Sequence, residues 1–276
     1  MVCKVTFART GMVLRNINSV HIESGWKRLT DTAELTLPRK AIFKENGKKD
    51  FKISEVKQYF KIGDPVMIEL GYDGKYQKEF EGYITHVSAD IPIKIKLEDE
   101  MYQLKKLPVN ISLQNTNLQT LLEKIIPGYE IDALEVELGA LKFAKTTVAK
   151  VLEYLKDEYS LYSYMEGKKL ICGKIYAVTV GDETGEERQL AYYGIEIEAE
   201  LKKLANEDLK KYKVDGFTGS LKAFGIPFFR HGMKVNLDSD LYPDRKGQYY
   251  LEETIVDFND TPEYRRKGQL GEKVTT

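Results

Sequence analysis

The chain has 276 residues, of which 42% are hydrophobic and 31% are charged, a balance typical of folded globular proteins rather than disordered ones. Its 42 basic and 43 acidic side chains leave a formal net charge of −1, so no overall field draws the molecule to nucleic acid or to an anionic membrane. The N-terminus lacks the apolar core of a signal peptide, and no stretch approaches the roughly 20 apolar residues of a membrane span. We therefore expect a chain of two or three domains that is made and folded in the cytoplasm.

From the start to about residue 107, apolar and polar residues alternate with a period of two. The pattern is plain in 3–7, 33–37, 66–70 and 91–97, and it predicts antiparallel strands with one buried and one solvated face. Pro92 lacks an N–H, which predicts that the 91–97 strand starts at a sheet edge. Turn-forming residues in 44–50 and 71–79 separate the strands, so the segment 1–107 is expected to form a small barrel or sandwich.

The segment 108–175 changes period and predicts a compact α/β insert. Apolar residues at helical spacing indicate one helix over 117–126, with Asn115, Thr116 or Asn117 as N-cap, and a second over 147–159, starting near Thr146 or Thr147. The following residues predict a hairpin with its turn at 166–168.

From Lys174 the period of two returns, and a second β-rich domain is predicted over 176–276. The residues 181–185, GDETG, have no following Lys-Ser/Thr helix that could hold a phosphate, so they are interpreted as a hairpin turn. The segment 200–213 fits a helix, while its flanks favour strand, and both alternatives stay open.

Two stretches of the β-rich segments resemble each other. Residues 60–68 and 229–237 share an aromatic residue, a basic residue, a glycine three positions after the aromatic, and a valine that opens a strand; each then leads to Gly-x-Tyr. The motif alone does not separate chance from duplication, because such turns enter many unrelated barrels. Its position on either side of one insert favours duplication. The signature residues of the turns and strands of the expected fold are Gly63, Asp64, Gly74, Gly82, Gly232 and Gly247.

Residues that would indicate catalysis or a cofactor do not form a pattern. His21, His86 and His231 lie in different segments without metal-ligand spacing, and Cys3 and Cys172 are far apart in apolar contexts, so buried free thiols are expected. No nucleophile elbow, dinucleotide fingerprint or phosphate loop is present. We expect no cofactor, no metal and no enzymatic activity.

Two other functions are compatible with parts of the sequence. A hydrolase using Asp64, Glu81 or Glu98 ranks low, because turn and strand roles explain these residues. The 18 tyrosines against one tryptophan suit either a carbohydrate or cell-surface binding module or protein interfaces. Without a dense stripe of basic and aromatic residues, interfaces are preferred over nucleic acid.

The order of segments and several local patterns resemble the baseplate hub family of contractile tails, the late control gene D proteins, which are related to the N-terminal part of VgrG-type spike proteins. The similar stretches are 60–68, 80–87, 97–105, the two helical segments, 159–173, 247–250 and 265–271. The resemblance implies an α+β, mainly β chain in which two similar antiparallel tube-type β-barrels, 1–107 and 176–276, flank the α/β insert 108–175.

The resemblance also implies a non-enzymatic function. Such hubs form a homo-trimer, a ring with pseudo-sixfold symmetry that joins the tail tube protein to the spike in the virion baseplate of a phage or related injection machine. Because the sequence stops at Thr276 with no needle module, a separate spike protein is expected beside other baseplate proteins. Contact with a membrane would be indirect, and no sequence-specific nucleic acid is expected. The main alternative is the β-rich carbohydrate or cell-surface binding module.

Overall fold

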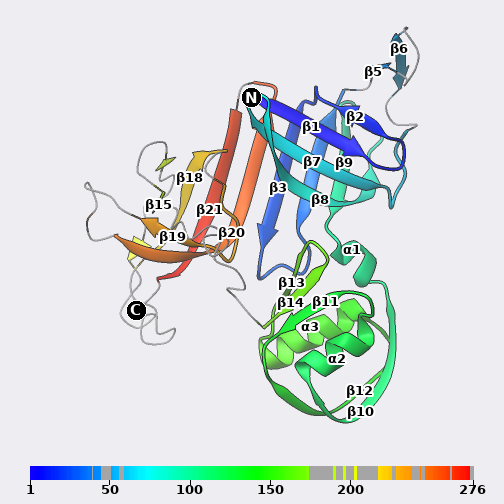
Figure 1. Ribbon diagram of the computed structural model, residues 1–276, viewed down its shortest axis with the longest axis vertical. Coiled ribbons are helices and arrows are strands. Elements are labelled where there is room, and N and C mark those ends of the chain that lie inside the picture. Colours follow the sequence, from blue (N-terminus) through cyan, green and yellow to red (C-terminus); the bar gives the residue numbers. More distant parts are fainter. Residues whose placement is uncertain are drawn as a thin grey trace. The chain divides into compact units, whose positions relative to one another are not determined.

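The computed structural model describes residues 1–38, 40–44, 51–55, 59–173, 189–190, 195–196, 202–203, 217–225, 228–237, 243, 246–261 and 263–273 (Figure 1). These residues are mainly β, as the sequence predicts, and they include three helices, of which the sequence predicts two. They divide into two compact units. Unit 1 consists of Met1–Ile22, Thr32–Tyr102 and Asp257–Tyr264, and unit 2 consists of Glu23–Asp31, Gln103–Val256 and Arg265–Thr276.

Unit 1 is built from antiparallel strands. Its strands are β1 (Val2–Phe7), β2 (Met12–Leu14), β4 (Thr32–Leu37), β7 (Pro65–Tyr72), β8 (Lys75–Val87) and β9 (Ile93–Glu98), with the first part of β3 (Ser19–Gly25), the end of β20 (Gly247–Asn259) and the start of β21 (Glu263–Lys273). The hairpin of β5 (Lys40–Lys44) and β6 (Phe51–Glu55) pairs on its own. The short helix α1 (Met101–Leu104) follows β9.

The core of unit 1 follows from the alternation seen in the sequence. Every second residue of β1, β4, β7 and β9 is buried, and removing such side chains from water contributes about 25 cal/mol per Å² of apolar surface. The strand order is β20, β3, β4, β9, β8, β7, β1, β2. The expected edge position of the strand after Pro92 is wrong: β9 pairs with β4 on one side and β8 on the other. Pro92 precedes the strand, where its missing N–H disturbs no ladder.

Unit 2 contains the predicted α/β part. Helices α2 (Leu118–Ile125) and α3 (Val148–Tyr159) pack with the ribbon β10 (Pro108–Asn117) and β12 (Glu137–Thr147), and with the sheet of β11 (Glu130–Ala133), β14 (Lys169–Cys172) and β13 (Ser163–Glu166) (Figure 1). Both predicted helices are confirmed, with Asn117 and Thr147 as the N-caps. The hairpin with its turn after Glu166 is also confirmed.

The remaining strands of unit 2 form the second β-rich part. They are β15 (Gln189–Leu190), β16 (Ile195–Glu196), β17 (Lys202–Lys203), β18 (Phe217–Phe224) and β19 (Lys234–Leu237), with most of β20 and β21. Their order is β16, β18, β21, β20, with β17 also on β18, and with β19 on β20 and β15 on β19. The turn 181–185 and most of 200–213 lie outside the described residues.

The strand pairings of neither unit close into a ring among the described residues. No helix in this part of the chain is long and apolar enough to cross a membrane. The described strands form a large sheet of mostly antiparallel pairs. The two closed barrels stay a prediction.

Candidate assembly surface

The first Gly turn, Lys61–Asp64 before β7, has three backbone hydrogen bonds, one within the turn and two to Ile84 of β8. The Gly63 N–H donates to the Ile84 carbonyl at 2.7 Å, the Asp64 N–H to the Lys61 carbonyl at 3.1 Å, and the Ile84 N–H to the Asp64 carbonyl at 3.0 Å. Gly63 has φ 86°, a conformation that costs little only for glycine. The turn thus directs both backbone groups of Ile84 at β7.

The second Gly turn has the same bonds between the matching residues. The Gly232 N–H donates to the Leu251 carbonyl at 2.7 Å, the Met233 N–H to the Arg230 carbonyl at 3.3 Å, and the Leu251 N–H to the Met233 carbonyl at 3.0 Å. Gly232 has φ 78°. Two segments separated by the α/β part therefore share sequence, backbone conformation and long-range bonding.

The residue after each glycine closes its turn with different chemistry. The Asp64 carboxylate accepts from the Lys61 N–H at 3.0 Å, and the Met233 Sδ accepts from the Arg230 N–H at 3.0 Å. The Asp64 carboxylate also binds the Arg9 Nε at 2.5 Å. Burial alone raises the pKa of Asp64, but the hydrogen bonds from Arg9 and from the Lys61 N–H outweigh burial, and this pKa lies below its ordinary value.

The strand order around the two turns is also similar. In unit 1 it is β3, β4, β9, β8, β7, β1, and in the second β-rich part it is β16 with β17, then β18, β21, β20, β19, β15. The last pair differs, since β1 is antiparallel to β7 and β15 is parallel to β19. Each series nonetheless puts its Gly turn at the start of the strand that forms a hairpin with a 13-residue strand, β8 or β20.

The two 13-residue strands, β8 and β20, differ in which strands pair with one of their edges. The β19 strand pairs only with the first four residues of β20, and β3 continues along the same edge, because β21 occupies the other edge. Two ion pairs in unit 2 join residues that follow β3 to residues of β20: Lys27–Glu252 (2.6 Å) and Arg28–Glu253 (2.7 Å). In unit 1 the His21 Nδ1 lies 2.6 Å from the Asp257 carboxylate.

On β8 no strand of the described part of the chain pairs with the last residues of the matching edge. Pro65, the first residue of β7, pairs with Tyr83, and β9 covers the other side. Thr85–Val87 extend past the end of β7, and within the described ranges no strand pairs with them on that side. The loop that follows exposes Ile91, 67% of whose surface is accessible to solvent.

The other glycines of the predicted pattern have separate roles. Gly74 has φ 79° in the two-residue turn between β7 and β8. Gly82 lies against β9, where a Cβ would fall 2.1 Å from the Glu98 carbonyl oxygen. Gly247 opens β20 with φ 156°. The structure thus brings Gly63, Asp64 and Gly82 to one pair of strands.

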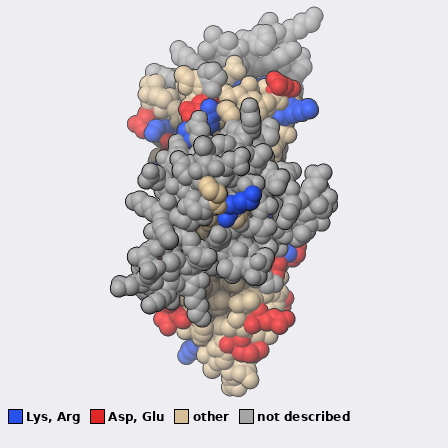
Figure 2. Space-filling model, turned by 90° about the vertical axis from the view of Figure 1, so that its left-hand side faces the viewer, with Lys and Arg blue, Asp and Glu red and all other residues tan. Residues whose placement is uncertain are grey.

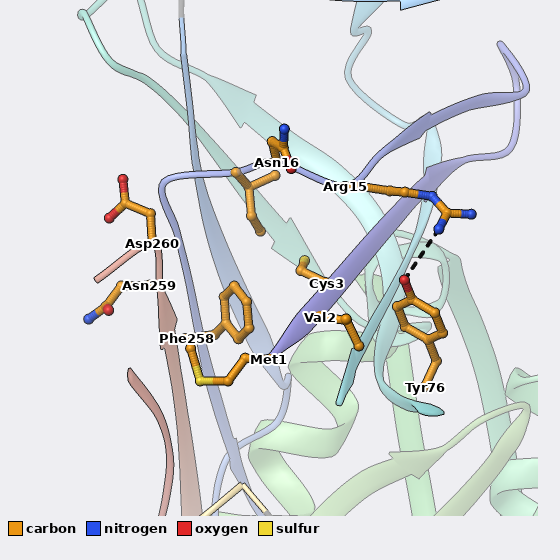
Figure 3. Close-up of a pocket in the computed structure, with 10 residues that line it drawn as sticks. Met1, Val2, Cys3, Arg15, Asn16, Tyr76, Phe258, Asn259 and Asp260 are labelled. Atoms are coloured by element: carbon orange, nitrogen blue, oxygen red, sulfur yellow. Dashed lines mark hydrogen bonds between the residues drawn. The ribbon is translucent and has the colours of Figure 1, made fainter. Parts of the chain in front are cut away.

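A groove of about 560 Å³ lies in unit 1 beside the chain start (Figure 3). The Arg15 guanidinium donates to the Tyr76 hydroxyl at 3.4 Å on one side, while Asn259 and Asp260 lie on the opposite side and Phe258 lies near Met1. Its lining mixes apolar side chains with both signs of charge. The sequence did not predict this groove, because its residues come from four distant segments.

The residues considered for catalysis do not converge. Glu81 pairs with Lys78 at 2.9 Å on the surface, and His86 is exposed on β8. His231 is buried, 3.6 Å from the Asp31 carboxylate. Among the described residues no group of three or more His, Cys, Asp or Glu could hold a metal ion.

Both cysteines are free and buried, as predicted. Burial raises the pKa of Cys3 to about 12 and that of Cys172 to about 11, although a hydrogen bond from Ser163 opposes the effect at Cys172. Basic and acidic side chains both appear among the described residues of the face drawn in Figure 2.

Comparison with solved structures gives the fold. A 43 kDa tail protein of prophage MuSo2 from Shewanella oneidensis matches with a TM-score of 0.64 at 10% identity, over 99% of this chain and 98% of that one. A tail protein from Neisseria meningitidis matches with a TM-score of 0.61 at 11% identity, over 98% and 95%. The chain has the fold of phage tail proteins.

A third structure extends this fold to secretion machines. The E. coli c3393 protein, a component of the type VI secretion system with structural similarity to bacteriophage tail proteins, matches with a TM-score of 0.58 at 9% identity, over 94% of this chain and 74% of that one. No protein-family model matches the sequence, and no curated protein is recognisably similar to it. The tail-protein fold is thus shared without detectable sequence similarity.

Proposed function

We propose that the chain is a non-enzymatic hub of a phage tail baseplate or a related injection machine, which joins the tail tube to the spike as a homo-trimer. In this proposal 1–107 and 176–276 are two tube-type barrels, and 108–175 is the insert between them. Three chains would present six similar barrels, which match a sixfold tube while keeping threefold symmetry toward the spike.

The repeated Gly turn carries this proposal. A pseudo-sixfold ring made from three chains needs two similar β-rich parts in each chain, and the paired hydrogen bonds of Gly63 and Gly232 support such a duplication. The similar strand order on both sides of the α/β part adds to it. The likeness to tail proteins over nearly the whole chain favours this use of the repeat over a carbohydrate-binding role.

Location in the particle tests the function. Antibodies against this chain, coupled to gold, would be added to tail particles of the phage or machine encoded by the same genome. We expect the label where the tube meets the spike, in negatively stained electron micrographs. Label along the whole tube, or none on any tail particle, would overturn the proposal.

Light scattering tests the trimer. The purified full chain is expected to give a species of about 95 kDa, three times 31.7 kDa, at a concentration of about 100 µM, where weak subunit contacts populate. Because the net charge is −1, raising the salt concentration should change this association little. A stable dimer or tetramer would contradict the threefold ring.

A further inference from the structure

The two long strands β8 and β20 give the chain one occupied and one open edge of the same kind. Past Leu251, β20 is paired by β3; past the matching Ile84, Thr85–Val87 have no strand on that side in the described part of the chain. An unpaired strand edge presents N–H and C=O groups that can accept another strand. A sheet that leaves such an edge uncovered is poised to pair with another chain.

The strand that would match β3 in the second β-rich part is identified by its neighbour. The β3 strand lies next to β4, and β16 and β17 both pair antiparallel with β18, which holds the place of β4 in the repeat. The other edge of β18 is taken by β21. Within the described residues, no strand covers the outer side of β16 or β17.

We infer that the open β8 edge, Thr85–Val87 with the loop to Pro92, pairs with the edge of β16 and β17 in a second copy of this chain. This inference rests on the proposed ring and specifies its joint between subunits. The pairing would repeat between copies the arrangement that β20 and β3 have within one chain. Three copies then provide six similar junctions, three within chains and three between them, and the ring closes on itself.

The loop beside the open edge supports a protein occupant. Residues 89–92 are all exposed, and Ile91 places a large apolar side chain in solvent at 67% exposure. Strand addition combines backbone hydrogen bonds with burial of such side chains. In the second β-rich part, the residues that match this loop are not a loop but the end of β20. The last residues of that strand, Asp257–Asn259, belong to unit 1.

Photo-crosslinking tests the pairing directly. A benzoylphenylalanine would replace Ile91 in the full chain, and the purified protein would be irradiated at about 100 µM, with cross-linked peptides identified by mass spectrometry. We expect links from position 91 to the segment of a second copy that carries β16 and β17. The same photoreactive residue at Val13, which is 43% exposed on β2 at the other end of the strand order, is the matched control and should not reach that segment.

A charge at the same position gives a second readout. We expect Ile91→Glu to weaken self-association about tenfold or more, since an edge charge opposes strand addition, while Val13→Glu leaves it unchanged. Links from position 91 to another surface, no links at all, or equal association of the two variants would overturn the edge pairing. The gold label in tail particles is scored independently, so failure of this joint is distinguishable from failure of the hub function.

Discussion

At the residue level, Asp64 gives the first Gly turn a carboxylate, which the second Gly turn, Arg230–Met233, lacks. The residue is 5% exposed, and its carboxylate accepts hydrogen bonds from Arg9 and from the Lys61 N–H, whereas Met233 closes the matching turn with a thioether. The pairing of Arg9 with Asp64 spans 55 residues of sequence. No local pattern could have predicted it.

This charge makes stability depend on pH. We expect Asp64→Asn to lower the free energy of unfolding by about 1.5 to 3 kcal/mol at neutral pH, the range for a hydrogen bond to a charged group. Since the folded pKa is lowered below 3.8, the carboxylate's contribution is full above the unfolded pKa and is lost as the pH falls through the folded pKa. Urea unfolding from pH 7 to pH 2 measures this difference.

The matched control for that experiment is Met233→Leu, which removes the thioether of the other turn and leaves no titrating group. Its effect on stability should not vary over the same pH range. A difference between wild type and Asp64→Asn that stays constant down to pH 2 would contradict the assigned role of the charge.

Among the elements, helices α2 and α3 both begin after an N-cap residue of a preferred type, but their N-cap hydrogen bonds differ. Both N-caps are extended residues of the preferred types, but only the Asn117 side chain accepts a hydrogen bond, from the Thr120 N–H at 2.8 Å. Thr147 caps α3 without a side-chain bond. The sequence predicted both helices because their apolar spacing is local; which cap forms its bond depends on a rotamer set by packing.

The caps therefore differ in what their removal costs. Asn117→Ala should destabilise the protein by about 1 kcal/mol, and Thr147→Ala by only a few tenths, because no cap bond is lost there. Chemical denaturation followed by circular dichroism compares the two variants. Equal losses would show that the Asn117 bond does not stabilise α2.

At the scale of the whole molecule, the chain passes repeatedly between its two units. The units consist of six alternating segments, so the chain crosses between them five times, and β3, β20 and β21 each supply residues to both. Unfolding either unit would release strands of the other. We therefore expect the units to unfold together, although each has its own buried core.

The two buried thiols report on this coupling, since Cys3 lies in unit 1 and Cys172 in unit 2. With pKa values raised to about 12 and about 11 by burial, neither should react with a maleimide at pH 7 in the native protein. In a urea series with brief labelling, both should become reactive at the same midpoint. Separate midpoints, read by mass spectrometry of the labelled peptides, would show independent units.

Elements whose cause is local could be predicted from the sequence: alternating strands, two helices with their caps, Gly turns and buried cysteines. These follow from periodicity and backbone conformation, which act over a few residues. Only the tertiary structure shows that β9 lies between β4 and β8 although Pro92 precedes it, and that Arg9 binds Asp64. It also shows that β3 pairs with β20, while among the described residues no strand pairs with the matching edge of β8. Strand neighbours are chosen by burial and edge pairing between distant segments, so no short stretch of sequence contains them.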